Sequence, residues 1–127
     1  MANPQQALQK MTEEFTTLQK ELSSVVEARQ TLESQLQENQ SVQKEFSGLD
    51  DGANIFKLIG PVLVKQDKSE AIMAVGGRLE FIEAEITRTE EKIKSIQEKQ
   101  EKMKIEIMQL QNIVVQQQQQ QQAQVAA

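Results

Sequence analysis

Two runs of apolar residues, spaced alternately three and four positions apart, constrain this chain more than any other feature. We call them the first and the second seam. The first seam comprises Leu8, Met11, Phe15, Leu18, Leu22, Val25, Arg29, Leu32, Leu36, Asn39, Gln43 and Phe46, and the second comprises Ile72, Val75, Leu79, Ile82, Ile86, Thr89, Ile93, Ile96, Gln100, Met103, Ile107, Leu110 and Val114. This spacing puts each seam on one face of an α-helix and is typical of coiled coils. The sequence therefore predicts two long helices, over residues 4–47 and 68–115.

The two seams match when the chain folds back on itself, because facing residues lie at equal distances from Ile59. Leu8 then faces Leu110, Leu36 faces Ile82 and Phe46 faces Ile72, with further pairs between them. Such agreement in phase is what an antiparallel two-helix coiled coil requires. The fold class that follows is mainly α, with the connection at one end of the coil and both termini at the other.

Three polar residues, Arg29, Asn39 and Gln43, occupy positions of the first seam. Arg29 would face Thr89, which places a polar layer opposite a polar layer. Two interpretations stay open for these residues. Their side chains either reach out to solvent, as tolerated exceptions, or select the register of the coil.

The stretch from Asn54 to Gln66 differs from the rest, because it is rich in β-branched residues and is interrupted by Gly60-Pro61. It predicts a β-hairpin. Alternation gives the hairpin two apolar faces, built from Ile55, Phe56, Leu58, Ile59, Val62, Leu63 and Val64. A two-stranded hairpin is marginal in water, and one with two apolar faces and two open edges needs partners to cover it. We therefore interpret this segment as an assembly device, an oligomer interface.

Composition removes most other functions. The chain has no cysteine, histidine, tyrosine or tryptophan, so most general bases, thiol nucleophiles and transition-metal ligands are missing. Its net charge of −5 disfavours nucleic acid and anionic membranes as partners. No stretch matches a secretory signal, a membrane span or a nucleotide-binding loop. We expect an intracellular protein that is not an enzyme and uses no metal and no cofactor.

Residues near the two termini carry surplus apolar side chains, several of them methionine. They are Leu8, Met11, Phe15, Met103, Ile105, Ile107, Met108 and Leu110. Methionine is flexible and polarizable and suits surfaces that accept varied apolar partners. Such a tip could hold exposed hydrophobic segments weakly. It could equally form a thicker seam or contact a third helix.

Two segments depart from a regular coil. Gly76-Gly77 interrupts the second helix and is either a pivot, a place of close backbone approach or a tolerated weak point. Residues 116–127 are rich in glutamine, and we expect them to be a disordered tail outside a domain of residues 1–115.

The segment Asn54–Gln66 between two matched coils, followed by Arg78-Leu79-Glu80-Phe81-Ile82, resembles the β-type subunits of prefoldin. The resemblance covers roughly Leu8 to Leu110. A single hairpin fits the β type, since α-type chains carry two. Gly76-Gly77 and the glutamine tail depart from the family pattern.

This resemblance implies a function. Hairpins of two α-type and four β-type subunits would assemble into double β-barrels, with Ile55–Ile59 and Val62–Lys65 as this chain's strands. The complex would be an ATP-independent cytoplasmic chaperone that passes unfolded actin and tubulin to the group II chaperonin, and the tip residues would contact these clients. The alternative is a structural spacer or tether that assembles through its hairpin and binds no unfolded protein.

Overall fold

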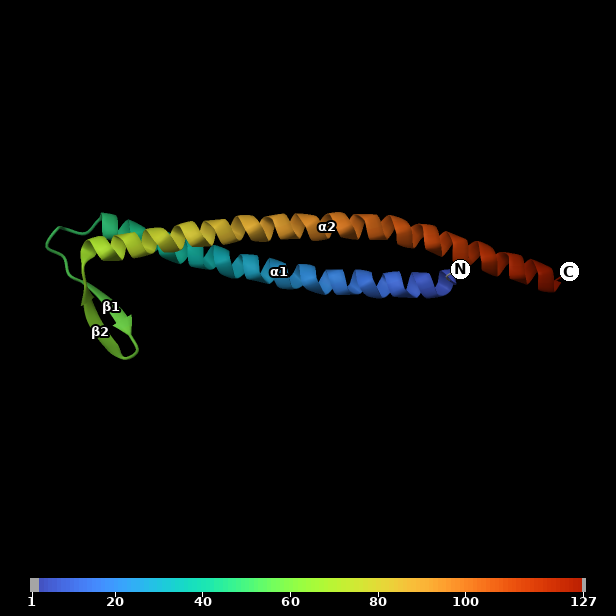
Figure 1. Cartoon of the computed structure of the whole chain (residues 1–127), viewed down its shortest axis with the longest axis horizontal. Coiled ribbons are helices and arrows are strands. Elements are labelled where there is room, and N and C mark those ends of the chain that lie inside the picture. Colours follow the sequence, from blue (N-terminus) through green and yellow to red (C-terminus); the bar gives the residue numbers. More distant parts are fainter. Residues whose placement is uncertain (1–2, 127) are drawn as a thin grey trace. The chain divides into compact units, whose positions relative to one another are not determined.

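The computed structural model describes residues 3–126, apart from the side chain of Ala126, and contains two helices and one hairpin (Figure 1). Helix α1 spans Pro4–Ser47, strands β1 and β2 span Ile55–Ile59 and Val62–Gln66, and helix α2 spans Lys68–Ala126. This is the expected mainly α fold with a single hairpin. The expected ranges 1–115 and 116–127 include Met1, Ala2 and Ala127, which lie outside the described residues. Within residues 3–126, neither helix is long and apolar enough to cross a membrane.

The chain divides into two compact units. Unit 1 combines Met1–Val26 with Glu91–Ala127, and unit 2 comprises Glu27–Glu90, which includes the hairpin. Each unit therefore contains one segment of α1 and one segment of α2.

In unit 1 the residues that are shielded from solvent are those of the two seams, together with Pro4 and Ala7 at the start of α1. Ile96 is buried, and the other seam positions of this unit are half-buried, namely Leu8, Met11, Phe15, Leu18, Leu22, Val25, Ile93, Gln100, Met103, Ile107, Leu110 and Val114. Removing this apolar surface from water is the main favourable term in pairing the two segments. The predicted seam positions are thus confirmed in unit 1.

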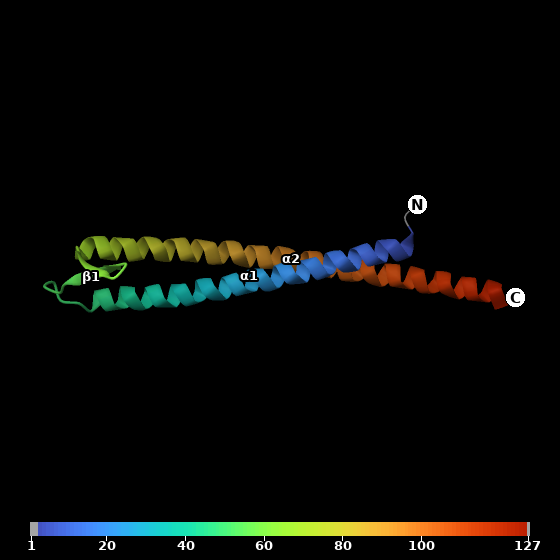
Figure 2. The same ribbon diagram turned by 90° about the horizontal axis from the view of Figure 1, so that it is seen from below.

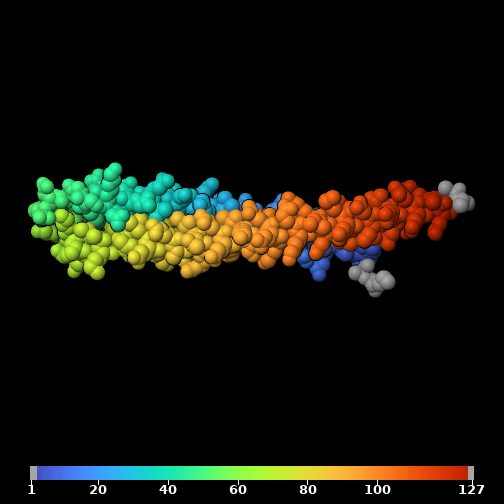
Figure 3. All heavy atoms as spheres, turned by 90° about the horizontal axis from the view of Figure 1, so that it is seen from above, coloured from blue at the N-terminus to red at the C-terminus, as the bar shows by residue number. Residues whose placement is uncertain are grey.

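In unit 2 the end of α1 and the start of α2 pack side by side, as the space-filling view shows (Figure 3). Val75, Leu79 and Ile82 of α2 are buried, and Leu32 and Leu36 of α1 are half-buried. The seam prediction holds here too, except near the hairpin.

Ile72 is more exposed than its seam position predicts. This side chain is 43% exposed, whereas its neighbour Ala71 is only 3% exposed. Ala71 borders a groove together with Ile55, so the first turn of α2 turns its buried face toward the hairpin as well as toward α1. Ile72 still lies beside Phe46, its predicted partner, at the edge of a shallow hollow. The hairpin contact, which a heptad pattern cannot include, causes the difference.

The hairpin is antiparallel, with Ile55 opposite Gln66 and Ile59 opposite Val62, and Figure 2 shows it beside the ends of the two helices. Gly60 and Pro61 form a two-residue turn in which Gly60 has a φ of +57°. Positive φ at the first central residue followed by proline is the pattern of a type II′ turn, whose twist suits a hairpin. Glycine is needed here because other residues are strained in this conformation.

Helix α1 begins with an N-cap, and Asp67 makes polar contacts at the start of α2. The Asn3 side chain accepts a hydrogen bond from the Gln5 amide at 3.0 Å. At α2 the Asp67 carbonyl accepts from the Ala71 amide, while the Asp67 carboxylate accepts from the Ser69 hydroxyl at 2.7 Å. The bond to Asn3 satisfies one of the backbone donors that the first turn of a helix leaves free, and the Ala71 bond is the first regular hydrogen bond of α2.

The loop between α1 and β1 is tied to the start of α2 by Lys68. Its ammonium donates to the carbonyl of Leu49 at 3.2 Å and lies 3.8 Å from the carboxylate of Asp51. Lys68 therefore fixes the connection from which the hairpin emerges.

Gly76-Gly77 does not break α2, which is helical through both residues. A Cβ added at either glycine would meet nothing within 4 Å, so none of the described residues outside their own helix turns approaches them closely. Close approach within the chain is thereby excluded as their role.

The glutamine run differs from the expectation of a disordered tail, because α2 continues through it to Ala126. Glutamine and alanine are good helix formers, and extending an existing helix avoids the cost of nucleation. The low-complexity composition concealed this propensity.

We predict that Gly77→Ala stabilises the protein. The exposed site has room for a methyl group, and alanine is favoured over glycine in a helix by about 1 kcal/mol. Urea unfolding followed by circular dichroism at the helical band will measure the change. The control, Gly60→Ala, should instead lower stability by about 1 kcal/mol because of its positive φ. Equal effects of the two substitutions would contradict this account.

Candidate functional site

The most exposed apolar part of unit 2 is the hairpin. Ile55, at the start of β1, is only 8% exposed. The six other apolar residues of the two strands are exposed to solvent, namely Phe56, Leu58, Ile59, Val62, Leu63 and Val64. We call these six residues the hairpin surface. It contains all of the predicted interface residues except Ile55. The structure brings them together on two paired strands.

The strand register assigns the hairpin surface to two faces. Leu58 lies opposite Leu63 on one face, with Phe56 beside them, and Ile59 lies opposite Val62 on the other, with Val64 beside them. Contiguous exposed apolar surface of this kind marks interaction sites in proteins. Both outer edges of the sheet also carry unpaired backbone groups, since the sheet has only two strands in the described chain.

A groove adjoins the hairpin surface where β1 lies against the helices. It is lined by apolar residues of α1, β1 and α2, together with two cationic side chains and one amide: Val42, Phe46, Ile55, Phe56, Ala71, Ala74, Val75, Lys57, Arg78 and Gln66. The sequence analysis missed this groove. Val42 could have indicated it, because it is an apolar residue outside the seam. Most of the residues that line the groove with Val42 come from β1 and α2, and only the folded chain brings them together.

The predicted tip residues all lie in unit 1, and the structure divides them into two groups. Leu8, Met11, Phe15, Met103, Ile107 and Leu110 are half-buried seam residues. Ile105 and Met108 are 58% and 63% exposed, on the outer side of α2 away from the seam. Val115 continues the same exposed line one heptad beyond Met108, and we call Ile105, Met108 and Val115 the outer stripe. Pairing with α1 does not account for this stripe.

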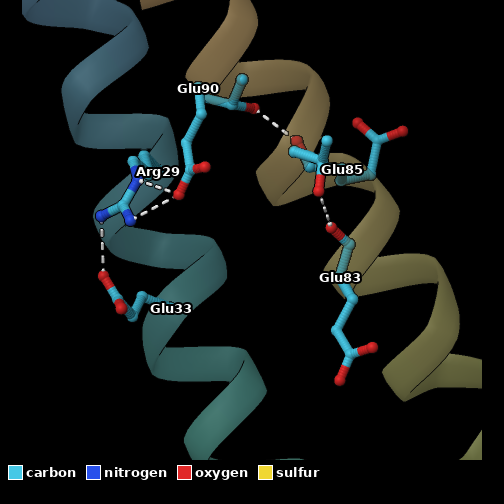
Figure 4. A network of polar contacts seen from close by, with 7 residues as sticks. Arg29, Glu33, Glu83, Glu85 and Glu90 are labelled. Atoms are coloured by element: carbon cyan, nitrogen blue, oxygen red, sulfur yellow. Dashed lines mark hydrogen bonds and ion pairs between the residues drawn. The ribbon is translucent and has the colours of Figure 1, made fainter.

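The polar layer of unit 2 is a network around Arg29 (Figure 4). Its guanidinium reaches across to α2 and donates to one carboxylate oxygen of Glu90, at 2.7 Å from Nη2 and 3.3 Å from Nε. Nη1 also pairs with Glu33 on its own helix at 2.9 Å. The hydrogen bond to Glu90 and the charge of Glu33 raise the pKa of Arg29, so the arginine stays charged.

This contact supports register selection for Arg29. Glu90 is adjacent to Thr89, the predicted partner, whose hydroxyl instead donates to the carbonyl of Glu85 at 2.7 Å. The predicted pairing is therefore correct to within one residue at this layer. By contrast, Asn39 donates to the Gln35 carbonyl of its own helix, and Gln43 is exposed, as the tolerated-exception interpretation expects.

The described residues offer little to catalysis. Among residues 3–126 no three potential metal-binding side chains converge, and no buried side-chain nitrogen or oxygen lacks a hydrogen-bond partner. The adjacent carboxylates at Glu13-Glu14, Asp50-Asp51 and Glu90-Glu91 are all exposed. The candidate sites that remain are the exposed apolar surfaces described above.

Comparison with known proteins agrees with this geometry. A family model described as prefoldin subunit matches residues 9–112 of the chain. The chain belongs to the prefoldin family. Members of this family are subunits of a prefoldin chaperone complex, so the chain is expected to work together with other prefoldin subunits.

Relatives within the prefoldin family extend over most of the chain. Prefoldin subunit 6 of Saccharomyces cerevisiae is 48% identical over 98 residues, which cover 77% of this chain and 86% of the relative. Prefoldin subunit 6 of Homo sapiens is 44% identical over 107 residues, covering 84% and 83%. The crystal structure of the prefoldin beta subunit from Thermococcus strain KS-1 superposes with a TM-score of 0.76 at 26% identity, covering 86% of this chain and 96% of that one. The resemblance to β-type subunits is thereby confirmed.

We predict that Arg29 and Glu90 are energetically coupled. A double-mutant cycle of Arg29→Met and Glu90→Gln, measured by urea unfolding, should give a favourable coupling between the helices. The coupling should shrink between about 0.1 M and about 1 M salt, since the Debye length falls from about 10 Å to about 3 Å.

The matched control is the pair of Lys104 and Glu101, which lie 3.3 Å apart on a single helix and are both more exposed than Arg29. Its coupling should be smaller, as is usual for exposed pairs. If Arg29 and Glu90 show no coupling at low salt, the network does not contribute to the register of the two helices.

Proposed function

We propose that this chain is a β-type subunit of a heterohexameric, ATP-independent prefoldin, and that it assembles through the hairpin surface. The observation that carries the proposal is the hairpin itself. This chain, a member of the prefoldin family, exposes six apolar residues on the two faces of its hairpin. Among the apolar residues of the hairpin, only Ile55 is buried.

The physics of the sheet supports assembly through further strands. Two strands alone are marginally stable, and open edges pair readily with other strands. Adding strands of neighbouring subunits at both edges would close the sheet into a barrel and satisfy its backbone groups. The expected double β-barrel of two α-type and four β-type subunits would do this.

We further propose that unit 1 binds unfolded polypeptides. The outer stripe offers apolar side chains that the seam leaves exposed, and methionine at its centre adapts to varied partners. The half-buried seam residues of the tip, such as Phe15 and Met103, would add contacts if the two helical segments separate locally. Such apolar contacts do not require a particular amino acid in the client. This lack of sequence preference suits a chaperone that binds unfolded chains.

The clients and the receiving partner follow from the family resemblance. Unfolded actin and tubulin would be held at the tips and passed to the group II chaperonin in the cytoplasm. Binding and release need no nucleotide, since the mechanism rests on weak apolar contacts at several sites of a multivalent complex.

The assembly proposal predicts that Phe56→Asp with Val62→Asp abolishes association with other prefoldin subunits. One charge on each apolar face cannot be buried in an interface without a partner. Co-expression with affinity-tagged α-type and β-type subunits of the same organism will measure recovery of the variant. Its helical circular dichroism should stay close to wild type, because the hairpin surface is not part of the seam.

The matched control places the same two charges at Gln30 and Thr87, which are exposed on the helices of unit 2. This control should be recovered like the wild type. A hairpin variant that still assembles would refute the proposed interface.

The client proposal predicts that Ile105→Ser with Met108→Ser weakens protection of a denatured client. Both side chains are exposed, so the loss should come from binding and not from unfolding of the seam. Light scattering of diluted, denatured actin in the presence of the purified hexamer will measure aggregation.

Gln109→Ser with Gln111→Ser is the control, because it alters neighbouring exposed positions without removing apolar surface. We expect this control to protect actin like the wild type. A hexamer that protects no denatured client, even in its wild-type form, would instead support the spacer or tether.

A further inference from the structure

The charges on the hairpin oppose those of the whole chain. The protein carries 19 acidic and 14 basic residues, yet β1, the turn and β2 contain Lys57 and Lys65 and no acidic residue. The register places Lys57 opposite Val64 and Lys65 opposite Phe56. Because these pairs lie on different faces, each apolar face of the hairpin carries one exposed ammonium group and no carboxylate.

Neither lysine forms an ion pair within the part of the chain that the structure describes, residues 3–126. Two of the acidic side chains that flank the hairpin make contacts away from it. Asp67 accepts the Ser69 hydroxyl at the start of α2, and Asp51 lies beside Lys68. The chain therefore supplies no evident counter-charge to the hairpin surface.

The adjoining groove shows the same imbalance. Lys57 and Arg78 both line it among apolar side chains, and none of its lining residues is acidic. A segment that enters this groove would meet two cations and an apolar wall. The groove and both faces of the hairpin thus share one electrostatic character.

Charge of this kind decides which partner can cover the surface. An ammonium group inside an apolar interface must be paired with an opposite charge to offset its desolvation. A second copy of this hairpin would bring lysine toward lysine, and like charges placed opposite each other are destabilising. A different chain that bears carboxylates at the facing positions would pair both lysines.

We infer that Lys57 and Lys65, supported by Arg78 in the groove, select as partner a different chain with an apolar, carboxylate-bearing β-surface and disfavour a second copy of this chain. The inference rests on the proposed function, because it names the chemistry of the neighbour at the proposed interface. Apolar burial then provides the attraction, and the lysines provide the discrimination.

The test is the double variant Lys57→Glu with Lys65→Glu, co-expressed with affinity-tagged α-type and β-type prefoldin subunits of the same organism. We expect recovery of the variant to fall by about tenfold or more, since carboxylates would then face carboxylates. Lys92→Glu with Lys99→Glu changes the net charge equally at exposed positions of α2 and should be recovered like the wild type.

A second arm uses only this chain. A mixture of the wild type and the Lys57→Glu, Lys65→Glu variant should associate more strongly in sedimentation velocity than either chain alone, because opposite charges then meet across the hairpins. Equal association in all three samples would overturn the inference.

The outcomes separate this inference from the assembly proposal. Full recovery of the lysine variant, together with loss of the Phe56→Asp, Val62→Asp variant, would leave the interface in place and refute charge selection. Full recovery of both variants would refute the interface, and the inference with it.

Discussion

Pairing of the two seams is the interaction on which the rest of the structure depends. Within each unit it removes from water the apolar residues that recur at heptad spacing, and few large apolar residues of the helices lie elsewhere. Whatever apolar surface remains exposed is consequently conspicuous. It includes the hairpin and a shorter stripe of α2 around Ile105 and Met108, and on α2 also Met73 and Phe81. We propose that the hairpin surface and the outer stripe carry the function, with the coil as their scaffold.

The hairpin shows how a marginal element can be held ready for a partner. Its own two strands contribute little stability, but Ile55 is buried near Ala71 and Val75, and Lys68 fixes the preceding loop to α2. These contacts anchor the base of the hairpin and leave both apolar faces free. The proposed assembly would need this arrangement, because a hairpin that buried both of its own faces would have no apolar surface left for a partner.

Charged residues act in two different settings in this chain. Arg29 is paired with Glu90 and Glu33 between the helical segments of unit 2, where geometry fixes one register. Lys57 and Lys65 lie on apolar faces of the hairpin and form no ion pair within residues 3–126. The first setting is complete within the described chain, and for the second we propose a carboxylate-bearing partner. The contrast indicates that specificity inside the subunit and specificity between subunits rest on separate groups.

The sequence by itself determined the helices, the seams, the hairpin with its turn at Gly60-Pro61, and the pairing of Arg29 to within one residue. These features follow from local periodicity and turn chemistry, which a linear pattern contains. It also identified the residues of the hairpin surface, since strand alternation alone assigns them to faces. The structure differs from the pattern in the exposure of Ile72 and in the continuation of α2 through the glutamine run.

Only the tertiary structure decided which of these side chains are exposed. It moved burial from Ile72 to Ala71, separated exposed Ile105 and Met108 from their half-buried neighbours, and created the groove that joins Val42 to Phe56. It also replaced the expected Arg29–Thr89 layer with the ion pair to Glu90. The physical reason is common to all four. Exposure and pairing depend on contacts between residues far apart in sequence, and periodicity within one helix does not contain them.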